Sequence, residues 1–323
     1  MRKLSASVEH SVVEASTHSS SIMINDHDEK DDFSPTSSTE INGPFVDDII
    51  FEILHFLDSM FILQICMKIS KQWRRVSFQI PLSLSFKPNH FKQDGKSIKL
   101  LADCECLKNL TSLGLNNNRI GIEGVKYIAE SECLKNLTSL NMELNRIGNE
   151  GAKYIAESES LQNLFSLNLY FNEIGSEGAK YIAESKCLNN LTSLNLYGNE
   201  IGDEGAKNIA ASECLKNLTS LNLGRNQIGN EGVKYIAESE CLKNLTSLDL
   251  TRNEIDNEGA KYIAKSECLK NLTSLSLELN GTGSEGVKCF AESECLKNLT
   301  SLRLHMTASD CLRNLISLNL HSN

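Results

Sequence analysis

The most regular feature of the chain is an alternation of leucine with polar residues that begins at Leu110 and returns every 27 residues. The later starts are Leu137, Leu164, Leu191, Leu218, Leu245, Leu272 and Leu299. The alternating first part of each unit, L-T-S-L-N-L, predicts a strand. The second part carries apolar residues at helical spacing, in the first full unit Ile128, Ala129, Cys133 and Leu134. One unit cannot bury its own apolar face, so the units must stack to form a core.

Two polar columns accompany this pattern. The ninth position is asparagine in nearly every unit: Asn118, Asn145, Asn172, Asn199, Asn226, Asn253, Asn280 and Asn323. Because the backbone of a buried turn needs hydrogen-bond partners, these amides are predicted to form a ladder along the stack. The position before the repeated glutamate is Asn149, Ser176, Asp203, Asn230, Asn257 or Ser284. These residue types predict that it caps the N-terminus of its helix.

The repeat resembles the ribonuclease-inhibitor-like class of leucine-rich repeat. The match runs from Leu110 to Asn323, where the last unit is truncated, and an earlier half-repeat covers residues 81–109. Within that half-repeat, Leu82 to Phe86 look like a first strand and Ile98 to Asn109 like the end of a helical part. The resemblance implies an α/β horseshoe solenoid with its parallel strands on the concave face. Residues 81–323 are therefore predicted to be one repeat domain.

Two different segments precede the repeats. Residues 1–43 are rich in serine and acidic residues and poor in large apolar ones, which predicts a disordered tail. Residues 44–80 are dense in isoleucine, leucine and phenylalanine at helical spacing, with breaks near Asp58 and near Ser70. This second segment is predicted to form three short helices.

The helical segment is similar to an F-box, whose pattern runs Leu-Pro-x-Glu-Leu-Leu-x-x-Ile-Leu-x-x-Leu and ends in a basic stretch around tryptophan. Phe45, Val46 and Asp48 take the Leu, Pro and Glu places, and the nearby Pro44 is displaced. The apolar places are taken by Ile49, Ile50, Ile53, Leu54 and Leu57, and the end by Trp73, Arg74 and Arg75.

The F-box resemblance implies docking on a Skp-type adaptor protein through Ile50, Ile53, Leu54 and Leu57. A helical piece of this length cannot sustain a core alone, and its apolar excess suits a partner helix bundle. The alternative interpretation is a helical cap that seals the open N-terminal end of the solenoid.

Composition narrows the classes of partner and compartment. The net charge of −10 argues against nucleic acid, and no apolar stretch approaches the ~18 residues of a membrane span. The first residues lack the apolar core of a secretory signal. The eleven cysteines include no CxxC pair, so we expect reduced, mostly buried thiols in the cytosol or nucleus. Without export, the recurring Asn-Leu-Thr triplets are interpreted as turns that lead into strands rather than glycosylation sites.

No residue pattern predicts catalysis. Candidate serines, cysteines and carboxylates recur in every unit, whereas a catalytic residue should be singular. GxEGxK is not a phosphate-binding loop, so no cofactor is expected. His305 and His321 share a column but are too few ligands for a metal site. We therefore expect a protein that is not an enzyme.

The variable positions are the two columns that follow the LxL core. The first reads Asn116, Glu143, Tyr170, Tyr197, Gly224, Thr251, Glu278, His305 and His321; the second reads Asn117, Leu144, Phe171, Gly198, Arg225, Arg252, Leu279, Met306 and Ser322. In a horseshoe both columns lie at the C-terminal edge of the strands. Tyrosine, phenylalanine and arginine are typical of binding hot spots. We predict a target-binding patch of Leu144, Tyr170, Phe171 and Tyr197 flanked by Arg225 and Arg252; the alternative is drift on an unconstrained surface.

The combination of an F-box-like segment with these repeats resembles the substrate-recognition subunits of SCF-type ubiquitin ligases, in which the F-box docks on the adaptor and the repeats hold the target. The predicted target carries an apolar residue next to negative charge. Two alternatives remain open. One is an interaction scaffold made of repeats with a helical N-terminal cap, and the other is a regulator of the Ran GTPase-activating type, which shares this repeat class.

Overall fold

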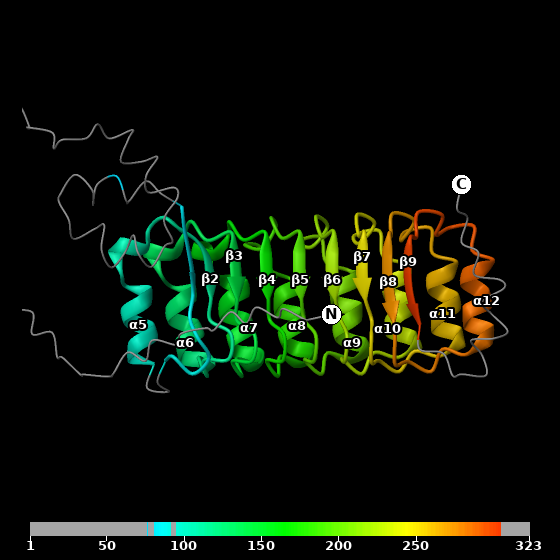
Figure 1. Cartoon of the computed structure of the whole chain (residues 1–323), viewed down its shortest axis with the longest axis horizontal. Coiled ribbons are helices and arrows are strands. Elements are labelled where there is room, and N and C mark those ends of the chain that lie inside the picture. Colours follow the sequence, from blue (N-terminus) through cyan, green and yellow to red (C-terminus); the bar gives the residue numbers. More distant parts are fainter. Residues whose placement is uncertain (1–75, 77–80, 92–94, 305–323) are drawn as a thin grey trace, which may run out of the picture. The chain divides into compact units, whose positions relative to one another are not determined.

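The described part of the chain is a stack of strand–helix units in two layers (Figure 1). The computed structural model describes residue 76, residues 81–91 and residues 95–304. In these residues one parallel sheet holds nine strands in sequential order, β1 to β9. The helices form the second layer, and each packs against the helix of the next repeat. This arrangement confirms the predicted α/β solenoid, with an open sheet that does not close on itself.

The strands and helices alternate with the period of the sequence. The strands are β1 (Leu82–Ser85), β2 (Leu110–Gly114), β3 (Ser139–Asn141), β4 (Ser166–Asn168), β5 (Ser193–Asn195), β6 (Ser220–Asn222), β7 (Ser247–Asp249), β8 (Ser274–Leu277) and β9 (Ser301–Leu304). The helices are α5 (Lys96–Ala102), α6 (Gly121–Ala129), α7 (Gly148–Glu157), α8 (Gly175–Ala183), α9 (Gly202–Ala210), α10 (Asn230–Ala237), α11 (Asn257–Ala264) and α12 (Ser284–Ala291). Three short 3-10 turns are η2 (Glu105–Leu107), η3 (Glu132–Leu134) and η4 (Glu159–Leu161). The predicted first strand and the half-repeat helix are confirmed as β1 and α5.

The core is a set of columns that equivalent residues of successive repeats form. Leu113 pairs with Leu140, which in turn pairs with Leu167, so a shift of one repeat preserves the register. Strand leucines and helix isoleucines such as Ile155 are almost completely buried between the two layers. Burying each such side chain stabilises the fold by about 1.5–3 kcal/mol. The core is therefore continuous from one repeat to the next.

The asparagine ladder is confirmed over the described repeats. Asn145 is fully buried, and its Oδ1 accepts hydrogen bonds from the backbone N–H of Asn118 and Ile120 in the preceding repeat. Its Nδ2 donates to the carbonyls of Leu115, at 2.9 Å, and Met142, at 2.8 Å. Each asparagine thus joins two repeats at the turn after the strand.

The predicted helix caps are wrong for their own helices. Helices α7, α8 and α9 begin one residue before Asn149, Ser176 and Asp203, so these residues lie inside the first turn. The reason is that several of these side chains accept hydrogen bonds from the following repeat. Asn149 accepts from the N–H of Gly178 at 2.7 Å, and Asp203 accepts from Gly229 and Gly232. Asn230 and Asn257 bond the next helix in the same way.

A serine column forms a further ladder between repeats, which the sequence analysis did not identify. The hydroxyl of each serine donates to the carbonyl of the last alanine in the helix of the preceding repeat, as from Ser131 to Ala102; the column is Ser131, Ser158, Ser185, Ser212, Ser239, Ser266 and Ser293. On the exposed side, asparagines of the Asn-Leu-Thr triplets also bond backward: Asn190 Nδ2 donates to the Gln162 carbonyl at 2.9 Å. Most polar columns of the repeat therefore connect neighbouring units.

The cysteine prediction is correct in part. Free thiols are found at Cys104, Cys133, Cys187, Cys214, Cys241, Cys268, Cys289 and Cys295. Of these, Cys133 and Cys214 are buried, and the other six are half-buried. The reason is that the column lies at the rim of the helix layer, where the thiol of Cys241 contacts the Glu213 carboxylate at 3.7 Å. Burial raises the pKa of Cys214 to about 11. Burial, followed by Glu213, also raises the pKa of Cys241.

Several predictions concern residues outside the described part of the chain. They are the tail of residues 1–43, the F-box-like segment with its adaptor-binding residues, the histidine pair, and the last strand of the truncated repeat. These remain predictions from the sequence.

Candidate functional site

The second variable column has the same unusual backbone conformation in every described repeat. The backbone angle φ is positive in this column: 57° at Leu144, 47° at Phe171, 51° at Arg225 and 56° at Arg252. Residues other than glycine and asparagine rarely adopt this left-handed region, which costs roughly 1–2 kcal/mol per residue. The chain nevertheless places bulky side chains there, and unusual conformations of this kind are enriched at functional sites.

The backbone of this column is already occupied by hydrogen bonds. The N–H of Leu144 donates to the Tyr170 carbonyl, and the N–H of Phe171 to the Tyr197 carbonyl. The same pattern continues at Arg225, whose N–H donates to Thr251 at 2.7 Å. These backbone hydrogen bonds between repeats do not involve the side chains of the column, which are therefore free to contact a ligand.

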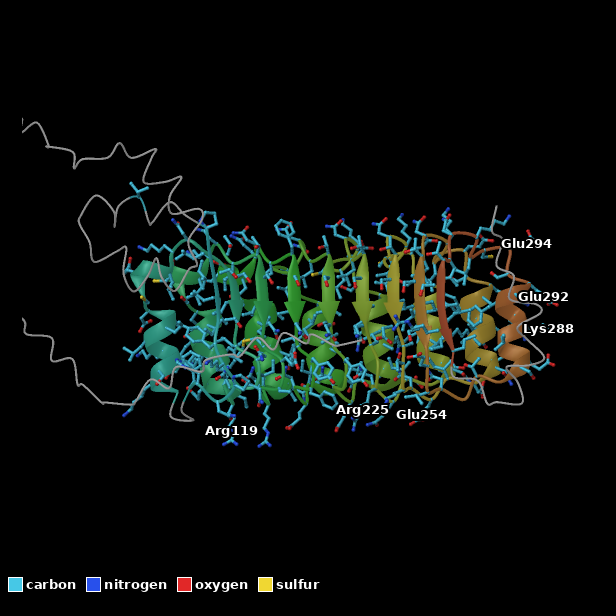
Figure 2. The ribbon with its side chains drawn as sticks, viewed as in Figure 1. Arg119, Arg225, Glu254, Lys288, Glu292 and Glu294 are labelled. Atoms are coloured by element: carbon cyan, nitrogen blue, oxygen red, sulfur yellow. The ribbon has the colours of Figure 1, made fainter. Side chains whose placement is uncertain are left out.

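A third column lies two residues further along each turn, and together with the second variable column it forms a groove. Arg119, Arg146, Glu173, Glu200 and Gln227 also have positive φ, between 54° and 60°. The groove has a volume of about 660 Å³ and is lined by Asn117, Arg119, Leu144, Arg146, Phe171, Glu173, Gly198, Glu200, Arg225, Gln227, Arg252, Asn253 and Glu254. Figure 2 shows Arg119, Arg225 and Glu254 along the same edge of the sheet. The groove thus crosses six successive repeats.

The three predicted aromatic residues form one cluster. The rings of Tyr170 and Tyr197 are stacked, with centroids 4.9 Å apart and planes inclined by 11°. Phe171 meets Tyr170 edge-on at a centroid distance of 4.6 Å. The guanidinium of Arg225 lies 4.9 Å from the centroid of the Phe171 ring, within the range of a cation–π interaction. The structure therefore brings four of the six predicted residues into direct contact.

Two glycines make room for these rings. A Cβ on Gly198 would lie 2.9 Å from the Phe171 ring, and a Cβ on Gly224 would lie 2.5 Å from the Tyr197 ring. Each ring therefore leans over the glycine of the following repeat. The sequence analysis recorded both glycines only as variable positions. The signal that could have found them is an aromatic residue followed, one repeat later in the same column, by glycine.

Leu144 and Arg252 lie in the same groove without joining the cluster. Leu144 comes from the repeat before Phe171 and is 40% exposed, which is high for a leucine. Arg252 comes from the repeat after Arg225 and is exposed. The six predicted residues thus lie at one edge of the sheet, but Tyr170 and Tyr197 stack beside the groove rather than line it.

The charges around the cluster are mixed. Partial burial raises the pKa of Tyr170, with smaller contributions from Tyr197 and Glu143, while Arg225 and Arg252 act in the opposite direction. In the groove, Arg146 approaches Glu173 at 4.0 Å, and both side chains are exposed. Such an exposed pair contributes at most about 1 kcal/mol and is easily rearranged.

The described residues offer no centre for metal chemistry. Over residues 95–304 and the shorter described stretches, no group of three or more histidine, cysteine, aspartate or glutamate side chains could hold a metal ion. In the same part of the chain, no helix has the length and apolar character needed to cross a membrane.

Comparison with protein families identifies the repeat. A model described as "Leucine Rich repeat" matches residues 106–129, 133–156, 160–183, 187–210, 214–237, 241–264 and 268–291, just over half of the chain. The chain belongs to the leucine-rich repeat family. The matched residues begin after the F-box-like segment. Leucine-rich repeats imply a scaffold for protein interactions, which is the broader class of the predicted substrate-recognition role.

No curated protein matches the chain. Among solved structures, one that matches is "Leiomodin-1 Actin-Binding Site 2 (ABS2)", which is 20% identical to this leucine-rich repeat protein. That match covers 45% of this chain and 85% of the other, with a TM-score of 0.34.

Proposed function

We propose that this leucine-rich repeat protein is the substrate-recognition subunit of an SCF-type ubiquitin ligase and binds its target protein in the groove at the strand ends. In this role the chain performs no chemistry itself. It holds the target close to the transferring enzyme, and proximity supplies the rate enhancement.

The observation that carries the target-binding half is the aromatic cluster. Tyr170, Phe171 and Tyr197 are only partly buried. The two tyrosine rings stack, Phe171 packs against them beside Gly198, and Arg225 lies over the Phe171 ring. No core column of the repeat needs these side chains. Rigid, partly exposed aromatic residues and arginine are the types that dominate protein-binding energies.

The ligase half rests on the resemblance of residues 44–80 to an F-box. The proposed adaptor-binding residues are Ile50, Ile53, Leu54 and Leu57. The segment ends directly before β1, which starts at Leu82. A short connection of this kind would hold the adaptor and the groove at a restricted distance.

The experiment is a capture assay with the full chain in three forms. The first is unmodified, the second carries Ile53→Asp with Leu54→Asp, and the third carries Tyr170→Ala with Phe171→Ala. Binding of a purified Skp-type adaptor and recovery of proteins from cells are measured for each form. Circular dichroism and thermal unfolding check that each variant is folded.

We expect the aspartate variant to lose the adaptor and keep the targets, because charge in the apolar contact breaks only that interface. The alanine variant should keep the adaptor and lose the targets. If the unmodified chain does not bind the adaptor, the ligase half is wrong and an interaction scaffold remains. If every recovered protein is retained without the aromatic pair, the target site is wrong.

A further inference from the structure

The groove has a charge pattern along its length. Arg119 and Arg146 lie in its first two repeats, and Arg225 and Arg252 in its last two. The second variable column presents the apolar residues Leu144 and Phe171, which come from repeats between those of Arg119 and Arg225. The groove therefore has arginines at both ends and apolar side chains between the outermost ones.

The middle repeats of the groove also carry acidic residues. Glu173 and Glu200 lie in the third column, two residues after Phe171 and Gly198, and both are exposed. They disfavour negative charge at the centre of a ligand. Glu254 lies at the far end, where Arg225 and Arg252 outnumber it. The groove therefore favours negative charge at its two ends and not in its middle.

The arginines at both ends have capacity for a ligand. Within the described residues, Arg119, Arg225 and Arg252 make no ion pair, and the Arg225 guanidinium lies over the Phe171 ring. Arg146 has the loose, exposed contact with Glu173. Guanidinium groups bind carboxylates in bidentate geometry, which makes acidic side chains their natural partners.

Part of the backbone along the groove is already bonded within the chain. The N–H groups of the second variable column, from Asn117 to Arg252, all donate to carbonyls of the following repeat. A ligand strand therefore cannot pair with these N–H groups. The exposed arginines and apolar side chains of the groove select the sequence of the ligand.

The length of the groove sets the length of the ligand. Neighbouring strands lie about 4.8 Å apart, so the five steps from the Arg119 repeat to the Arg252 repeat span roughly 24 Å. An extended chain rises about 3.3 Å per residue, so roughly seven residues cover this distance.

We propose that the groove binds an extended peptide segment of about seven residues, with acidic residues at both ends and a large apolar residue at the centre. This inference rests on the proposed function, since it specifies what the target presents. The acidic ends pair with the two arginine pairs, and the apolar residue contacts Leu144 and Phe171.

The test measures binding of labelled synthetic peptides to the full chain by fluorescence anisotropy. The first probe carries two aspartates at each end and Leu-Phe at the centre. Three others have lysines at both ends, aspartates at only one end, or aspartates at the centre with the apolar pair removed. We expect the first probe to bind best, and the one-ended probe to bind severalfold more weakly.

Matched variants locate the binding. Leu144→Asn and Leu279→Asn change the same residue type at the same left-handed φ, 57° and 56°, and both leucines are exposed. Leu279 does not line the groove. Only Leu144→Asn should weaken the first probe. In the same way, Arg252→Gln should weaken it about threefold while Arg303→Gln, on the exposed face of β9, should not.

The outcomes separate this inference from the proposed function. Stronger binding of the lysine probe, equal binding of all probes, or no binding of any probe would overturn the inference. In each of these cases the capture assay with Tyr170→Ala and Phe171→Ala still decides whether the groove region binds proteins at all. If captured targets depend on the aromatic pair but the peptide pattern fails, target binding stands and the ligand chemistry is wrong.

Discussion

Replacing Asn199 with alanine tests whether the asparagine ladder holds the repeats together. Asn199 is fully buried at the turn beside the aromatic cluster. Its Oδ1 accepts from the N–H groups of Asn172, at 2.9 Å, and Ile174, at 3.3 Å, in the preceding repeat. Its Nδ2 donates to the carbonyls of Leu169 and Leu196, at 2.8 and 2.9 Å. An alanine supplies none of these bonds.

The magnitude follows from the groups that lose their partners. The two backbone N–H groups, of Asn172 and Ile174, are left in the interior, and each unsatisfied buried donor costs about 1–3 kcal/mol. Asn199→Ala should therefore lower the free energy of unfolding by roughly 2–6 kcal/mol. This is a large fraction of the about 5–15 kcal/mol that stabilises a typical domain.

Asn190→Ala is the matched control, because Asn190 is exposed and makes one hydrogen bond, from Nδ2 to the Gln162 carbonyl. It should cost less than about 1 kcal/mol. Urea unfolding followed by circular dichroism gives both values, and hydrogen exchange should show faster exchange at Asn172 and Ile174 in the Asn199 variant alone. Equal losses for the two variants would refute the ladder as the main connection between repeats at this turn.

Three further predictions concern other columns. Lysines such as Lys153 lie over a tyrosine ring of the following repeat, but the residue in that place after Lys180 is Asn208. Asn208→Tyr would supply this ring and should stabilise the fold by about 0.5–1 kcal/mol in thermal unfolding; no gain would contradict the prediction. Ser212→Ala should cost about 1–3 kcal/mol in urea unfolding, since the buried Ala183 carbonyl at the end of α8, in the preceding repeat, loses its donor. In the native protein, thiol labelling of the buried Cys214 should be slower than that of the half-buried Cys241. The labelling rate of Cys214 should rise with pH up to about pH 11, because the reactive thiolate forms only there. Faster labelling of Cys214 than of Cys241 would refute the assigned burial.

The strands, helices and core were predictable because each follows from a local pattern. The alternation from Leu110 needs no knowledge of the neighbouring repeat, and the strand it predicts is β2. The period of 27 residues then places every later strand. The asparagine ladder was predictable as well, because a buried turn must satisfy its backbone groups whichever repeat supplies the partner.

The helix caps were not predictable in the same way, because their partners are in another repeat. Asn149 fits the local rule for a cap, yet its Oδ1 bonds the N–H of Gly178. Asn149 and Gly178 are one repeat plus two residues apart in sequence, and the rules for capping a single helix do not consider a partner in another repeat. The partial exposure of cysteines such as Cys241 has a similar origin, since it depends on how the helix layer ends.

The candidate site was predictable as a pair of columns but not as a cluster. Column variation identified Tyr170, Phe171 and Tyr197. The stacking depends on the direction in which each ring leans, and that direction depends on the empty space above Gly198 and Gly224. The left-handed backbone of the second column was also absent from the prediction, because Leu, Phe and Arg are residues that disfavour it.

The position of the variable columns explains why they are free to vary. The fixed polar columns, such as the buried asparagines and serines, bond the backbone of a neighbouring repeat, so a change there removes a connection. At the second variable column the connection is made by the backbone itself, as in the bond from the Phe171 N–H to the Tyr197 carbonyl. Side chains there can change without loss of the ladder. Glycine or asparagine would fit this left-handed backbone best, yet the column holds leucine, phenylalanine and arginine in the groove, and leucine again at Leu279 outside it.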